Sequence, residues 1–67
     1  MTFKIGDLVR AKHPMSPRMT IEYIVDERAS YHTGLDMGIH VFWFDNESFI
    51  HREVFHPELL ETAGNSH

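Results

Sequence analysis

The chain has 67 residues, with six Lys and Arg, ten Asp and Glu, six His and no Cys, and its formal net charge is −4. Domains typically hold about 100–150 residues, so this length allows at most one domain and leaves little from which to build an enzyme. The missing cysteines exclude a disulfide framework, a zinc ribbon and a thiol nucleophile, and they are compatible with the cytoplasmic location that we expect. The longest apolar run, residues 41–44, is far shorter than the roughly 18 residues of a membrane span, so no membrane is expected.

The first half of the chain is expected to form two strands. Gly6 and Asp7 form a turn signal that precedes a strand over residues 8–12. Residues 13–17 hold two prolines, which a central strand does not tolerate, and therefore form a loop. Over residues 19–25 apolar side chains alternate with polar ones, which indicates a half-buried strand. The alternating apolar side chains, expected to face the core together, are Met19, Ile21, Tyr23 and Val25.

The second half begins with a polar stretch, residues 26–38, which contains two glycines and is expected to be a long loop. Residues 39–44 are β-branched and aromatic apart from one histidine, so they are expected to form the strongest strand. Asp45 and Asn46 form a turn signal, and a further strand is expected over residues 48–54. These strands predict an all-β domain built as a small antiparallel barrel.

The C-terminal part is expected to close the domain. Pro57 suits the first position of a short 3₁₀ or helical turn. Residues 62–67 are small and polar, and we expect them to be a flexible tail that follows a single domain over residues 1–61.

The hairpin around Asp45 and Asn46 is expected to have two apolar faces. With any even number of loop residues, one face carries Ile39, Val41, Trp43 and Ile50, and the other carries His40, Phe42, Phe44, Phe49 and His51. An odd number would flip one strand relative to the other. We assign the first face to the core. The second is either covered by residues 55–60 or exposed as a partner surface.

Six histidines raise the possibility of a metal site. A two-residue hairpin loop would place His40 opposite His51, with Glu47 or Glu53 nearby, whereas zinc takes three or four ligands. This pair is a weak metal candidate, and we expect no cofactor. The chain also has no nucleophile elbow and no glycine-rich phosphate loop, so we expect no catalytic residues, no small-molecule substrate and no enzyme activity.

The charge distribution leaves nucleic-acid binding as an alternative. Residues 1–18 hold four Lys or Arg and one acid, and the rest of the chain holds two Arg and nine acids. Aromatic residues on an open sheet face suit single-stranded nucleic acid, but phosphate contacts need basic neighbours. Asp45 and Glu47 flank the aromatic stretch and would repel phosphate. We therefore rank nucleic acid below protein as a partner.

Four short motifs resemble those of the small bacterial YodC-like proteins. They are residues 3–9 (FKIGDLV), residues 17–21 (PRMTI), residues 43–45 (WFD), and residues 53–56 (EVFH) followed by residues 59–61 (LLE). The resemblance covers about residues 3–61 and implies an SH3-like β-barrel with no established activity, so no catalytic or ligand residue is carried over. The chain departs from the family pattern at Met15 and Ser16, which replace paired glycines, at Val41, which replaces a cysteine, and in a longer segment 26–38.

Together these observations predict a small SH3-like antiparallel barrel of four to five short strands. We expect a non-enzymatic protein-interaction module that is able to self-associate as a homodimer. The candidate partner-binding residues are Phe42, Phe44, Phe49 and Arg18, the last because core packing does not require a polar residue beside Pro17. A nucleic-acid-binding barrel and a histidine-based metal-binding module are the alternatives.

Overall fold

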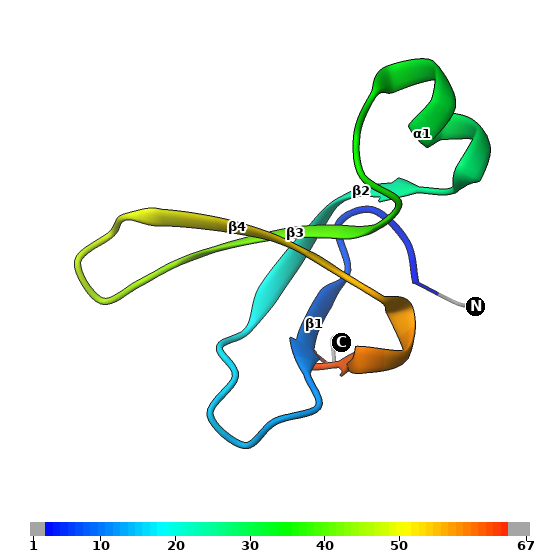
Figure 1. Cartoon of the computed structure of the whole chain (residues 1–67). Helices are drawn as coiled ribbons and strands as arrows, with labels where there is room; N and C mark the ends of the chain where they lie inside the picture. The colour runs from blue at the N-terminus through cyan, green and yellow to red at the C-terminus, as the bar shows by residue number, and fades with distance from the viewer. Residues whose placement is uncertain (1–2, 65–67) are drawn as a thin grey trace.

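The first and last strands of the chain lie side by side, which bends a single antiparallel sheet into a small barrel-like fold (Figure 1). The computed structural model describes residues 3–64. The strands are β1 (Leu8–Ala11), β2 (Met19–Val25), β3 (Gly38–Phe44), β4 (Ile50–Phe55) and β5 (Leu60–Thr62), in the sheet order β4-β3-β2-β1-β5. A short helix, α1 (Glu27–Thr33), joins β2 to β3, and a 3₁₀ turn, η1 (Pro57–Leu59), joins β4 to β5. This architecture confirms the predicted all-β fold, a small barrel-like antiparallel sheet of five strands with a closing 3₁₀ turn.

The core lies on one face of the bent sheet. Its buried side chains come from four of the strands and are Val9, Met19, Ile21, Ile39, Val41 and Leu60. Trp43 and Phe55 are partly buried and pack against this cluster. Each buried side chain of this size contributes about 1.5–3 kcal/mol relative to exposure, so a core of this extent supports only a modestly stable domain.

A β-bulge in β2 changes which side chains face the core. Ile21 pairs with Val41, but Tyr23 pairs with the next residue, His40, so Glu22 is an extra residue in the ladder. The prediction that Tyr23 faces the core is therefore wrong. Its side chain is 50% exposed on the opposite face, where its ring and the His40 ring form a T-shaped pair with centroids 6.3 Å apart.

Helix α1 replaces part of the loop that was expected over residues 26–38. The Asp26 side chain caps its first turn by accepting a hydrogen bond from the Ala29 backbone N–H (2.8 Å). Gly34, with φ 78°, ends the helix in the left-handed conformation that glycine adopts readily. No residue of α1 is buried. The helix therefore depends on its two caps rather than on an apolar stripe, which explains why hydrophobic periodicity did not reveal it.

The β3–β4 turn has an odd number of residues, so the even loop on which the expected faces of the hairpin depended is wrong. The Asp45 N–H donates to the Phe49 carbonyl (3.0 Å), which leaves Asn46, Glu47 and Ser48 as the connection. Ser48 has φ 70°, as expected for a three-residue turn that ends in the left-handed conformation. The odd loop flips β4 relative to the expected register.

Replacing Ser48 by glycine is expected to stabilise the protein. Glycine relieves the left-handed strain at this position, although it raises the entropy of the unfolded chain, so the expected net gain is at most about 1 kcal/mol. Urea denaturation followed by circular dichroism measures the change. Asn46→Gly is the matched control, because Asn46 lies in the same turn without a positive φ and should bring no gain. An equal gain from both substitutions would contradict the assignment of strain to Ser48.

The C-terminal turn and strand lie close to the predicted positions. Pro57 occupies the first position of η1, as expected. The sheet extends one residue into the segment predicted to be a tail, because Thr62, the last residue of β5, pairs with Val9 of β1. The rest of that segment includes residues 65–67, which lie outside the described residues. Within residues 3–64, no helix has the length and apolar character of a membrane span.

Candidate functional site

The ladder between β3 and β4 determines which side chains point away from the core. Phe44 pairs with Ile50, Phe42 with Arg52, and His40 with Val54. Two residues that pair across the ladder have their side chains on the same face of the sheet. His40, Phe42 and Phe44 alternate along β3 with the buried Ile39 and Val41, so these three pairs point away from the core. The side chains opposite the core are Tyr23, His40, Phe42, Phe44, Ile50, Arg52 and Val54, and we call their surface the outer face.

An apolar cluster covers the far end of this face, and we call Phe42, Phe44 and Ile50 the distal patch. The two phenylalanine rings meet edge to face, with centroids 6.3 Å apart and planes 86° apart. Phe44 is 60% exposed and Ile50 is 42% exposed, while Phe42 is half-buried. The hairpin projects beyond the end of β2 (Figure 1). Residues 55–60 do not cover Phe44. Of the two expected alternatives, cover by this segment or exposure, the structure therefore shows exposure at Phe44.

The other two candidate residues lie near the distal patch but differ from each other. Phe49 is 64% exposed, but it lies at the end of the turn and pairs with Asp45. Since Asp45 is the next residue after Phe44, Phe49 and Phe44 lie on opposite faces. The prediction that Phe49 shares a strand face with Phe44 is therefore wrong, and Ile50 takes that place. Arg18 is exposed and directly precedes β2. Since Thr20 pairs with Phe42, Arg18 would come level with Phe44 if the same register continued.

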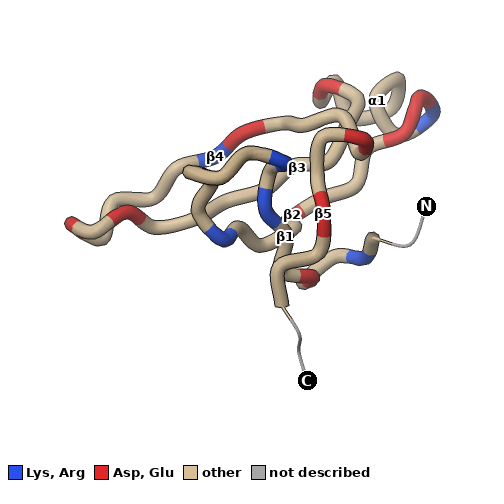
Figure 2. The backbone as a smooth tube through the Cα atoms, turned by 90° about the horizontal axis from the view of Figure 1, so that it is seen from below, with Lys and Arg blue, Asp and Glu red and all other residues tan. Residues whose placement is uncertain are grey.

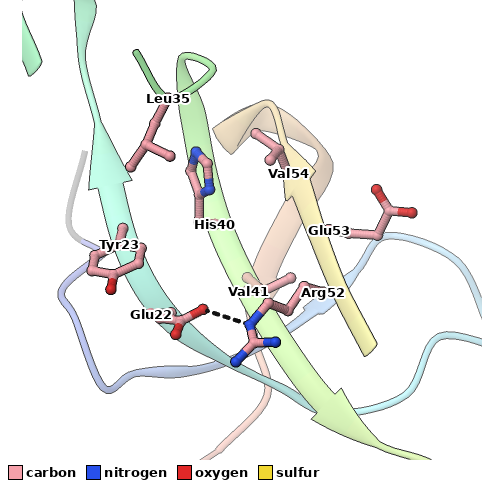
Figure 3. A pocket seen from close by; sticks show the side chains of 8 residues that line it. All are labelled: Glu22, Tyr23, Leu35, His40, Val41, Arg52, Glu53 and Val54. Carbon is pink, nitrogen blue, oxygen red and sulfur yellow. Dashed lines mark hydrogen bonds and ion pairs between the residues drawn. The ribbon is translucent and has the colours of Figure 1, made fainter. Parts of the chain in front are cut away.

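A hollow of about 480 Å³ lies on the outer face, nearer to α1. Its walls are formed by Glu22, Tyr23, Leu35, His40, Val41, Arg52, Glu53 and Val54 (Figure 3). His40 Nε2 lies 2.7 Å from the Asp36 carbonyl oxygen. Because a carbonyl only accepts, this nitrogen donates and the ring is tied to the connection between α1 and β3. The hollow therefore combines apolar side chains with a fixed imidazole and with the charged groups of Glu22, Arg52 and Glu53.

An ion pair separates the hollow from the distal patch. Arg52 Nε lies 3.3 Å from Glu22 Oε1, so the pair joins β4 to β2 across β3 (Figure 3). The even-loop expectation placed Arg52 on the opposite face, and the odd turn corrects this. Exposed pairs of this kind contribute about 0–1 kcal/mol, so the main effect here is to hold the guanidinium in place on the outer face.

The other side of the hairpin is organised around His51. Its ring stacks on Trp43, with centroids 5.3 Å apart, and its Nε2 donates to Asp45 Oδ2 at 2.9 Å. The Asp45 Oδ1 accepts the backbone N–H groups of Glu47 (2.8 Å) and Phe49 (3.0 Å). The hydrogen bond to His51, followed by that to Phe49, holds the pKa of the Asp45 carboxyl below its ordinary value.

The expected pairing of His40 with His51 is wrong. Because His40 pairs with Val54 and His51 pairs with Trp43, the two imidazoles lie on opposite faces of the hairpin. Among residues 3–64, no group of three or more His, Asp or Glu side chains is placed to hold a metal ion. The geometry thus brings together aromatic and aliphatic side chains rather than metal ligands.

Charged residues of both signs are spread over the barrel. Figure 2 shows acidic residues at the tip of the β3–β4 hairpin, in α1 and in β5, with basic residues nearer the middle of the sheet. Two of the basic side chains already face carboxylates, since Arg52 pairs with Glu22 and Arg10 lies 3.9 Å from Glu61. The distal patch therefore lies beside an acidic tip.

Sequence reasoning identified Phe42 and Phe44 but missed Ile50, Tyr23 and the hollow. Two local shifts in the strand register account for these omissions, and neither has a strong sequence signal. A bulge at Glu22 and the odd turn that ends at Ser48 both shift the alternation by one residue. No family model matches the chain, and no curated protein or solved structure is significantly similar to it.

Proposed function

We propose that this chain is a non-enzymatic protein-interaction module that binds its partner through the distal patch. The observation that carries the proposal is the exposure of Phe44 (60%) beside Phe42 and Ile50, on a hairpin that projects from the barrel. Contiguous exposed apolar side chains are costly in water and mark contact surfaces. Burying one phenylalanine contributes about 1.5–3 kcal/mol, enough for such a patch to anchor an interface.

The surroundings of the patch support a protein partner. Interfaces typically have an aromatic centre with a polar rim in which arginine is enriched. Here Arg52 borders Phe42 and is held by Glu22, while Arg18 precedes the strand next to β3. The acidic tip beside the patch disfavours phosphate, which supports the ranking of protein above nucleic acid.

The setting that we propose follows from the sequence resemblance. A YodC-like protein with this barrel would act in the bacterial cytoplasm, bound to another protein or to a second copy of itself. No catalytic step is needed for this role, and none is part of the proposal.

Phe44→Asp is expected to abolish partner binding while the protein stays folded. The aspartate places a charge at the centre of the patch, and Phe44 contributes little to the core because it is mostly exposed. We expect a photo-cross-linking amino acid at position 44 to capture a protein partner in cells that express the chain. Excess wild-type protein should compete this product away, and excess Phe44→Asp protein should not.

Tyr31 provides the matched control, since it is an aromatic residue that is 87% exposed on α1, away from the distal patch. A cross-linker at position 31 should capture no partner, and Tyr31→Asp protein should compete as well as the wild type. Circular dichroism checks that both variants are folded. Equal capture at positions 31 and 44, or equal competition by both variants, would show that the distal patch is not the contact surface.

A further inference from the structure

Strand β4 is an open edge of the sheet. It stands at one end of the strand order, and the five residues from Ile50 to Val54 are all exposed. Among residues 3–64, no backbone hydrogen bond outside the β3–β4 ladder includes any of these five residues. An exposed edge of this length is a template on which another strand can pair.

The free edge has a defined set of hydrogen-bonding groups. Because the Asp45 N–H donates to the Phe49 carbonyl, the inward-directed backbone groups of β4 belong to alternate residues from Phe49 onward. The N–H and C=O groups of Ile50, Arg52 and Val54 therefore point away from β3. Three evenly spaced residues are available to pair with an incoming strand.

The sequence of this edge is complementary to itself. If a second copy of β4 pairs antiparallel with Arg52 facing its equivalent, Ile50 faces the partner's Val54 and His51 faces the partner's Glu53. Each of these pairs occurs twice because of the two-fold symmetry. Apolar pairs and histidine–carboxylate pairs are favourable cross-strand neighbours, so four of the five positions match.

The fifth position, where two arginines face each other, is already compensated. Like charges directly opposite one another are unfavourable, but each Arg52 has a carboxylate of its own chain, Glu22, at 3.3 Å. Moving the register by two residues in either direction is worse. One shift puts Glu53 against Glu53, and the other puts His51 against His51. Of these three registers, the one centred on Arg52 has the most favourable pairs.

We propose that a second copy of this chain pairs with the free edge of β4, antiparallel and centred on Arg52, and so forms a symmetric homodimer with one continuous sheet. The two outer faces then lie on the same side, and Ile50 of each distal patch meets Val54 at the hollow of the other copy. Figure 3 shows Val54 directed toward the hollow and Glu53 directed away from β3, on the open side of β4. This inference goes beyond the proposed function, because the free edge adjoins the distal patch only at Ile50 and leaves Phe42 and Phe44 one strand away on β3.

The register is tested with single cysteines, which is direct because the chain has none of its own. Arg52→Cys should give a disulfide-linked dimer on mild oxidation, since directly opposite residues lie about 5.5 Å apart between Cα atoms. Val54→Cys alone should not, because its equivalent lies about four residues away along the pair of strands, roughly 13 Å. A mixture of Ile50→Cys and Val54→Cys should form the linked dimer again.

Sedimentation equilibrium tests the charge complementarity without cysteines. Glu53→Lys removes the carboxylate from two favourable pairs and should weaken the dimer by about tenfold or more. Glu58→Lys makes the same charge change on η1 and should leave the association unchanged. Both glutamates are exposed, so both variants should fold.

A wild type that stays monomeric at high concentration would overturn this inference, as would equal effects of Glu53→Lys and Glu58→Lys or linkage of Val54→Cys as readily as of Arg52→Cys. None of these results tests the proposed function, which is tested by cross-linking at positions 44 and 31. Capture of a different protein at position 44 by a monomeric chain would refute self-pairing and support the proposed function, whereas absence of both would refute both.

Discussion

Replacing Gly38 by alanine is expected to destabilise the protein by about 3 kcal/mol or more, which would leave a domain of this size largely unfolded. Gly38 has φ +136°, a conformation that residues with a side chain rarely adopt. A Cβ atom there would lie 2.8 Å from Val54 Cγ1 and 2.9 Å from the Phe55 carbonyl oxygen. Both the backbone and the neighbouring strand would have to move.

Urea denaturation monitored by tryptophan fluorescence measures this effect. Gly34→Ala is the matched control, because Gly34 also has a positive φ (+78°) but no atom lies within 4 Å of a Cβ built there. Its cost should be limited to about 1–2 kcal/mol of backbone strain. If the two alanine variants were equally stable, the close approach of β4 to Gly38 would not be the cause of the loss.

Asp45→Ala is expected to loosen the far end of the β3–β4 hairpin. It removes three hydrogen bonds at once, two from the turn backbone and one from His51. The urea midpoint should fall, and amide protons of the turn should exchange faster with solvent. Asp36→Ala is the matched control, because the hydrogen bond to Asp36 uses its backbone carbonyl, which alanine keeps. This variant should leave the urea midpoint and the exchange rates unchanged.

The same substitution should remove part of the protein's acid sensitivity. Because folding lowers the pKa of Asp45, its carboxylate stabilises the folded state fully above the unfolded value of about 4, and this contribution is lost as the pH falls through the lower folded value. A series of denaturation curves from pH 7 to pH 2.5 should show a shallower decline for Asp45→Ala than for the wild type. Parallel declines would mean that the hydrogen bonds from His51 and the turn backbone do not stabilise the ionised carboxylate of Asp45.

The parts of the fold that follow from period-two alternation could be predicted from the sequence. Ile39 and Val41 were expected in the core and are almost fully buried, and the adjacent Phe42 and Phe44 were expected on the other face. Pro57 likewise predicted the closing 3₁₀ turn. In each of these cases a residue's neighbours in sequence were enough to determine its environment.

The main errors arise where a single residue shifts the alternation or where caps replace an apolar stripe. The extra residue Glu22 moves Tyr23 to the outer face, and the left-handed Ser48 moves Ile50 there in place of Phe49. Neither shift has a strong sequence signal, since serine rarely adopts a positive φ. The hollow depends on both of them, which is why the candidate site could be predicted only in part.

The odd length of the β3–β4 turn has a consequence for how this region can vary. Adding or removing one residue would rotate β4 by half a turn about its axis. His51 and Glu53 would then lie on the outer face, and Ile50 and Arg52 would lie on the core side of the sheet. Changes by two residues would leave every side chain of β4 on its present side. We therefore expect only even-numbered insertions and deletions at the hairpin tip to keep the two faces of β4 as they are.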